Sequence, residues 1–302
     1  MNNDNSTPAV INNPTPYPIE TKVRFPAVVE LVNSSYKHQW SPTEDIPWDA
    51  LDGSEFPDEV REAAREFWSL RAWMEHGAVP YGAERLRQAI FEQRPFEIKQ
   101  QITNFIREEL RHFEASYLIA ERLGGFIPAP KDAYFEAIIP KFHDESDEQE
   151  LPFYTNLFLN TLFEAVSGEL LQDRYHNAVN PAIKEVCRLI LADEARHIRF
   201  GRILMKEELT SIPEKNRQII AEKFEQKLRG SLLRGVYAVT NLPPELQASA
   251  GRARAITAAN GLGATDPSRE PELIASGLRS LRKEVVEIGI TLPFFPEIGD
   301  IE

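Results

Sequence analysis

The strongest constraint on how this chain can fold is a spacing between an acid and a histidine that occurs twice. Glu109 and His112 stand three residues apart in NFIREELRHFEAS, and Glu194 and His197 stand three residues apart in LADEARHIRFG. Three residues of α-helix turn through about 300°, so each acid and its histidine share one face, about one turn apart. Each pair can therefore present a carboxylate and an imidazole to one metal ion or to adjacent ions.

Both pairs lie on apolar helix faces. The apolar neighbours are Ile102, Phe105, Ile106 and Phe113 for the first pair and Cys187, Ile190 and Leu191 for the second. A carboxylate is costly to bury unless a cation or a metal accompanies it. The alternative is that Arg111 and Arg196 neutralise the two acids on a half-buried surface, but two copies of the motif favour a metal site.

The chain is expected to be all-α. Apolar residues recur at helical spacing from residue 58 onward, and no alternating strand pattern of useful length occurs. We expect one helix from Asp58, kinked or interrupted by Gly77 and Pro80 before it resumes through AERLRQAIF. A second helix spans about 96–123 and ends at Gly124-Gly125. A third spans about 153–177, and a fourth runs to about residue 209 after the turn at Asn180-Pro181.

The remaining segments suggest one elaborated bundle. A flexible arm rich in Asn, Pro and Thr is expected at 1–22, and a single helical domain at 23–302. Its core is the four-helix bundle at about 58–209, followed by additional C-terminal helices at about 213–290, near 213–236, 244–258 and 270–288. Between the second and third helices, KDAYFEAIIPKF suggests a short helix and HDESDEQELP an acidic loop.

The antiparallel register of the third and fourth helices predicts a third acid. If these helices turn near residue 179 or 180, residues that face each other have numbers that sum to about 359. Glu194 then faces about residue 165, which selects Glu164 over Glu169.

The same argument applies to the first two helices, which turn near residue 93 or 94. Glu75 has apolar flanks and matches the layer of the first motif, whereas the alternative, Glu84, has Arg87 and Gln88 as neighbours. Gly77 and Pro80 can shift this register, so Glu84 stays open as an alternative.

The predicted metal ligands are therefore four carboxylates and two imidazoles: Glu75, Glu109, His112, Glu164, Glu194 and His197. Four negative charges suit two divalent cations, and carboxylates can bridge a pair of ions. Without thiolates, such a ligand set favours iron or manganese over a structural zinc. Asp193 is placed to orient a histidine across the bundle.

The segments EELRH and DEARH resemble the ferritin-like di-iron carboxylate superfamily over about residues 58–209. The resemblance implies a ferritin-like bundle that binds O₂ at a reduced centre of two Fe ions, with an Mn/Fe pair left open. A rubrerythrin-type thiolate iron site needs more than the single Cys187, and about 90 residues follow the fourth helix, more than in ferritins.

Two further positions separate members of this superfamily. Ser116 stands one turn past the first histidine, where the ribonucleotide reductase small subunit carries a tyrosine, and Tyr117 is rotated by about 100°. Ile190 stands where enzymes similar to p-aminobenzoate N-oxygenase carry a third histidine.

The expected function is that of an oxygenase that hydroxylates, desaturates or N-oxygenates a small organic substrate. Thr161, Ser167 and Gly168 are expected either to line the O₂ side or simply to allow close packing. Phe105, Phe113, Phe158 and Trp68 either wall a substrate pocket or simply form core. The alternatives are an iron-handling or peroxide-scavenging protein, a radical generator similar to the reductase small subunit, and a helical interaction protein without a metal.

Composition bears on the partners. A net charge of −13 disfavours nucleic acid and anionic membranes. The start of the chain does not resemble a secretory signal, and no window approaches a membrane span, so we expect a cytoplasmic protein. Because no flavin or iron–sulfur motif occurs, electrons should come from a separate ferredoxin or reductase; a homodimer is open.

Overall fold

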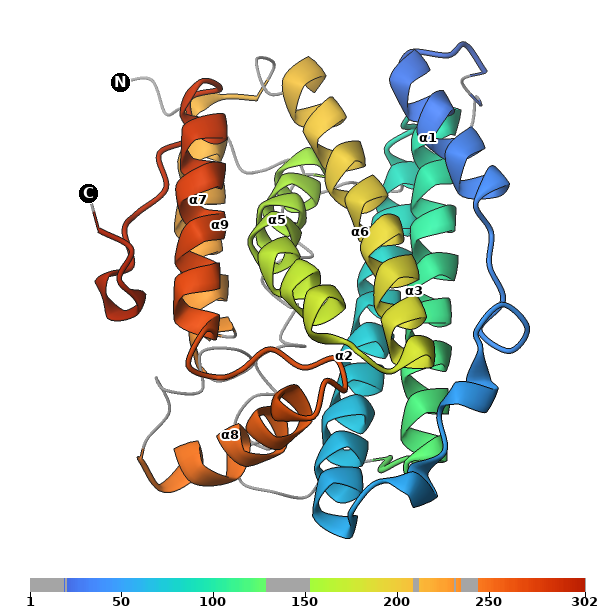
Figure 1. Cartoon of the computed structure of the whole chain (residues 1–302). Coiled ribbons are helices and arrows are strands. Elements are labelled where there is room, and N and C mark those ends of the chain that lie inside the picture. Colours follow the sequence, from blue (N-terminus) through green and yellow to red (C-terminus); the bar gives the residue numbers. More distant parts are fainter. Residues whose placement is uncertain are drawn as a thin grey trace, which may run out of the picture.

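The computed structural model describes residues 19, 21–128, 153–208, 212–230, 232–234 and 244–301, and this part of the chain is helical (Figure 1). It contains no β-strand, only an isolated bridge between Phe295 and Asp300. None of its helices is long and apolar enough to cross a membrane. The predicted all-α class is thus confirmed. The short helix and acidic loop expected between 131 and 152, and nearly all of the expected arm at 1–22, lie outside the described residues.

Four long helices form the bundle. They are α2 (Asp58–Phe91), α3 (Phe96–Arg122), α5 (Phe153–Asn177) and α6 (Pro181–Glu208). The expected interruption of the first helix is wrong, because α2 runs through Gly77 and Pro80. Pro80 faces outward, while Gly77 and Tyr81 on either side are buried, so packing holds the helix across the proline. Gly124 and Gly125 follow the end of α3, and their φ angles of +116° and +109° are ones that glycine adopts readily.

The C-terminal helices cover α5, which is the most enclosed helix of the bundle. Seven consecutive side chains at its start, residues 153–159, are buried, so it needs neighbours on every side. The helix α6 packs on one side of it, and α7 (Glu214–Gly230) and α9 (Glu270–Val286) pack on the other (Figure 1). The helix α8 (Pro244–Ala259) packs against α2. The helix predicted near 213–236 is shorter than expected, and the 3₁₀ turn η4 (Leu232–Arg234) follows it.

One helix was not predicted. It is α1 (Pro26–Lys37), which lies against α3 and α6 on the outer side of the bundle (Figure 1). The buried carboxylate of Glu97 in α3 accepts hydrogen bonds from the backbone N–H groups of Arg24 and Phe25, at 2.7 and 2.8 Å. This acid thus satisfies donors at the start of α1. The chain then passes over the bundle through Trp40 and the 3₁₀ turns η1 (Trp48–Ala50) and η2 (Gly53–Glu55). Another 3₁₀ turn, η6 (Pro296–Ile298), lies near the C-terminus.

Candidate metal centre

The four bundle helices bring all six predicted residues together in the interior. Glu75 comes from α2, Glu164 from α5, and the two acid–histidine pairs come from α3 and α6. Two groups could each hold an ion, because their ligand atoms lie within 4.8 Å of one another. The first group is Glu75, Glu109, His112 and Glu194, and the second is Glu164, Glu194 and His197.

The two histidines face the carboxylates through the same ring nitrogen. The Nδ1 atom of His112 lies 3.6 Å from both Glu109 Oε2 and Glu194 Oε1. The Nδ1 atom of His197 lies 3.4 Å from Glu109 Oε1 and 3.3 Å from Glu194 Oε2. Both nitrogens are buried, and neither makes a hydrogen bond. Buried polar atoms without partners are rare in proteins, so this pair fits ligands that point at a cation.

The opposite nitrogen of each ring contacts an acid on the facing helix. His112 Nε2 lies 3.2 Å from Asp193 Oδ2, and His197 Nε2 lies 2.8 Å from Glu108 Oε2. A neutral imidazole that donates from Nε2 to a carboxylate keeps a lone pair on Nδ1, which is the form that binds metals. The role predicted for Asp193 has this geometry. Glu108 was missed, although it precedes Glu109 just as Asp193 precedes Glu194.

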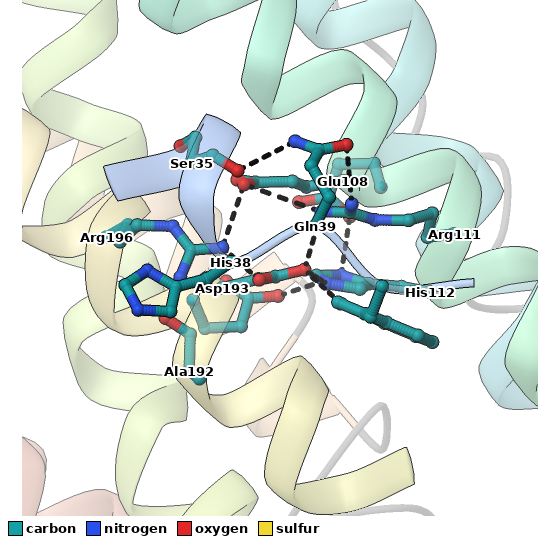
Figure 2. Close-up of polar contacts among 12 residues, drawn as sticks. Ser35, His38, Gln39, Glu108, Arg111, His112, Ala192, Asp193 and Arg196 are labelled. Atoms are coloured by element: carbon teal, nitrogen blue, oxygen red, sulfur yellow. Dashed lines mark hydrogen bonds and ion pairs between the residues drawn. The ribbon is translucent and has the colours of Figure 1, made fainter. Parts of the chain in front are cut away.

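Two arginines pair with the acids that contact the histidines, and these four side chains form a buried layer of charges. Arg196 lies 2.8 Å from Glu108 and also pairs with Asp193, and Arg111 lies 3.1 Å from Asp193 and 3.5 Å from Glu108 (Figure 2). All four side chains are buried, and their charges balance. The arginines therefore do not neutralise Glu109 and Glu194, as the surface alternative required. They neutralise the acids that hold the histidines.

Trp40 seals this layer from the outer side. Its indole N–H donates to Asp193 Oδ2 at 3.0 Å, and its ring stacks on that of His112 with centroids 6.5 Å apart. The guanidinium of Arg111 lies over the same indole. The segment after α1 thus shields Asp193 and His112 from water, a contribution that no helical periodicity could indicate.

The cluster holds more negative than positive charge. Among the described residues, its four carboxylates share a cavity with two cations, Arg71, which pairs with Glu75 one turn along α2, and Lys227. Burial, with repulsion from Glu194 and Glu109, raises the pKa of Glu164 to about 8, and burial with repulsion from Glu194 also raises the pKa of Glu109. Burial disfavours the charged form of His112, but Asp193, Glu109 and Glu194 outweigh it and raise its pKa to about 9. The protein groups alone therefore favour uptake of positive charge.

The two alternative acids, Glu84 and Glu169, lie away from the cluster. Glu84 pairs with Arg87 at 2.7 Å on the outer face of α2. Glu169 lies against α9, where a Cβ on Gly277 would come within 3.5 Å of its Cγ atom. The structure thus groups Glu75 and Glu164 with the two motifs, as the register predicted.

A cavity of about 120 Å³ opens directly onto the carboxylates. Besides Glu75, Glu109, Glu164 and Glu194, it is lined by Arg71, Met74, Gly77, Ala78, Tyr81, Phe105, Asn160, Phe163, Ser167, Leu171, Lys227 and Leu232. Of the four aromatic residues expected to wall a substrate pocket, only Phe105 lines this cavity. Ser167 lines it as well, whereas Thr161 lies in a smaller cavity beside His197.

Comparisons with known proteins bear on the fold. No protein-family model matches this sequence, and no curated protein sequence matches it. Solved structures do match. A variant of an R2-like ligand-binding oxidase with an aerobically reconstituted Mn/Fe cofactor aligns with a TM-score of 0.62 and 13% identity, over 85% of this chain and 93% of the oxidase.

Two other structures of R2-like ligand-binding oxidases agree. One, with a metal cofactor after photoconversion, has a TM-score of 0.62 at 13% identity, and a variant with an Fe/Fe cofactor has 0.60 at 14%. Each alignment covers 85% of this chain and 92% of the oxidase. The chain has the ferritin-like fold. The fold implied by the EELRH and DEARH segments is therefore confirmed.

The raised pKa values predict how a chelator-treated protein responds to pH. A histidine whose pKa rises from 6.5 to about 9 on folding stabilises the fold fully below 6.5 and loses this effect as pH rises through 9. The pKa of Glu164 is raised from 4.5 in the unfolded chain to about 8 in the folded chain. Ionisation of this carboxyl therefore also lowers the stability of the fold as pH rises from 4.5 to 8. The Tm of the chelated ferritin-like chain should thus fall between pH 6.5 and 9. Calorimetry at both pH values tests this, and a Tm that rises over this interval would contradict it.

Proposed function

We propose that this protein binds two redox-active metal ions, two Fe or one Mn and one Fe, and uses O₂ to oxidise a small organic substrate. One observation carries the proposal: two buried histidine nitrogens without hydrogen bonds face the same two carboxylates. The Mn/Fe and Fe/Fe cofactors of the oxidases with this fold support the choice of metals. The bound ions would supply the electrons that reduce O₂.

The distances suggest separate roles for the carboxylates. Glu109 and Glu194 each direct one oxygen toward His112 and the other toward His197, at 3.3 to 3.6 Å. We therefore propose that each of them would help to hold both ions. Glu75 belongs to the group around His112 and Glu164 to the group around His197, so each would hold one ion.

The cavity over the cluster limits the size of the substrate. A cavity of about 150 Å³ can hold one benzene molecule, so about 120 Å³ suits a single ring or a short chain. Its apolar lining includes Met74, Tyr81, Phe105 and Phe163. Such walls would exclude water from the reacting group of the substrate, and they would hold the substrate beside the carboxylates.

Thr161 and Ser167 remain our candidates for the O₂ side. The Thr161 hydroxyl donates to the Leu157 carbonyl oxygen and the Ser167 hydroxyl to the Glu164 carbonyl oxygen, both at 2.9 Å. Each hydroxyl oxygen keeps lone pairs, so either residue could accept a hydrogen bond from a protonated group. The reaction type, hydroxylation, desaturation or N-oxygenation, belongs to this proposal, as do a separate electron donor, a cytoplasmic location and a single domain over 23–302.

Oxygen uptake tests the proposal. Metal-loaded protein is reduced without O₂, and O₂ consumption is then followed with a panel of single-ring and short-chain compounds, with ¹⁸O₂ to trace the oxygen. We expect at least one compound to accelerate uptake and to be oxidised. A rate that no compound alters would contradict the oxygenase and favour the iron-handling alternative.

A cavity-filling variant sharpens the same experiment. Ala78 lines the cavity, and Ala83 lies exposed on the same helix. Ala78→Leu should keep its metals but lose the acceleration by substrate, because its longer side chain takes up cavity space. Ala83→Leu is the matched control and should behave as the unmodified protein. Equal acceleration in both variants would place the substrate outside this cavity.

A further inference from the structure

A second, smaller cavity adjoins the six-residue cluster on the side of His197. It measures about 20 Å³, which is room for one water-sized group. Its lining comprises Tyr81, Gly82, Arg85, Gln101, Ile102, Phe105, Leu157, Asn160, Thr161, Glu164, His197 and Phe200. It shares Tyr81, Phe105, Asn160 and Glu164 with the cavity proposed for the substrate, so the two are neighbours.

Arg85 brings a buried positive charge to this smaller cavity. Its side chain, on α2, is 1% exposed and lies over the ring of Tyr81, with Cζ 5.0 Å from the ring centroid. The Nε and Nη1 atoms make no hydrogen bond, and no described acid forms an ion pair with it. Two nearby arginines differ, because Arg87 pairs with Glu84 and Arg94 pairs with Glu92.

Gln101 adds a second buried polar group that lacks partners. It projects from α3 into the same cavity and is fully buried, and neither its amide nitrogen nor its amide oxygen makes a hydrogen bond. A buried guanidinium and a buried amide are both costly when they lack partners, so a fold keeps them together only when something compensates them. The cost is removed if a ligand supplies the missing acceptor.

We infer that Arg85 and Gln101 bind the carboxylate of an organic acid, and that this acid is the substrate of the neighbouring cluster. The inference rests on the proposed function for the identity of the site, but its evidence lies in these two side chains. The guanidinium supplies the charge and the amide N–H group a further donor.

A carboxylate fits this cavity better than a larger anion does. With room for about one water-sized group, the cavity can take one oxygen of a carboxylate but not the four oxygens of a phosphate or sulfate. The carbon atoms that follow the carboxylate would lie in the larger neighbouring cavity, which shares Tyr81, Phe105 and Glu164 with this one. Because the carboxylates of the cluster line that larger cavity, those carbon atoms would lie beside the cluster.

Binding of matched acids and amides tests the inference. Benzoate and butyrate are compared with benzamide and butyramide, which have similar shapes without the charge, by calorimetric titration of the full-length, metal-loaded protein. We expect each acid to bind at least tenfold more tightly than its amide. Arg85→Met should remove this preference, and Gln101→Met should reduce it. Arg87→Met, an exposed arginine two residues along α2, is the matched control and should leave it intact.

Other outcomes separate the alternatives. If the preference for acids persists in Arg85→Met, the acids bind the metals directly and the inference is wrong. If Arg85→Met lowers Tm far more than Arg87→Met does, Arg85 serves the fold and the inference is also wrong. Metal content is measured on the same samples. An intact preference in a protein that binds no metal would refute the proposed function and leave the carboxylate site standing.

Discussion

Glu194→Ala is expected to reduce the metal content of protein made in iron-replete medium from about two ions per chain to well below one. Glu194 belongs to both groups of candidate ligands, and its two oxygens face different histidines. Its loss should therefore weaken both ion positions together. Metal analysis of the purified protein measures this directly.

Thermal unfolding supplies a second measurement of the same variant. A ligand present at 1,000 times its Kd stabilises a fold by about 4 kcal/mol, which corresponds to roughly 10 °C in Tm. The unmodified protein should show such a difference between its loaded and chelated forms, and Glu194→Ala should not. Glu207→Ala, at an exposed position of α6, is the control. Unchanged metal content in Glu194→Ala would disprove the proposed centre.

Asp193→Ala is expected to destabilise the chelated protein by about 3–5 kcal/mol, because it leaves buried charges without a partner. Asp193 accepts from Trp40 and His112 and pairs with Arg111 and Arg196. His112 and Arg196 hold the pKa of this carboxyl well below its usual range in spite of burial, so it stays ionised. Without it, Glu108 is the remaining described acid that pairs with both guanidinium groups.

A surface pair on the same helix provides the comparison. Glu185 and Arg188 are three residues apart, like Asp193 and Arg196, but both are partly exposed. Removing one partner of such a pair costs about 0–1 kcal/mol. Urea unfolding of Glu185→Ala and Asp193→Ala measures the contrast. Equal costs in the two variants would show that the buried network does not stabilise the fold.

Much of the bundle could be predicted because helix patterns are local. The third helix was expected at 153–177, and α5 has these bounds. The antiparallel register about Asn180-Pro181 then placed Glu164 beside Glu194, since the facing positions of two joined helices follow from the turn between them. The pairing of α2 with α3 selected Glu75 in the same way, because the uninterrupted helix preserved the register across Pro80.

Other parts could not be predicted from local patterns. The helix α1 is anchored by Glu97, which lies more than 70 residues away in the chain. Arg71 follows the ordinary i, i+4 spacing with Glu75, a spacing that is equally common in exposed pairs. The continuity of α2 depended on packing around Pro80, which outweighed the local preference for a break.

The sequence by itself determined which residue types could form the centre and which helices carry them, because side-chain spacing along a helix and the turn between adjacent helices are set locally. Only the tertiary structure decided which histidine nitrogen faces which carboxylate. It also decided that Glu108 contacts the histidine of α6 and Asp193 the histidine of α3, and that Arg85 and Gln101 line one cavity. Those features depend on the rotation and distance of helices from distant parts of the chain, and the packing of the whole bundle sets these.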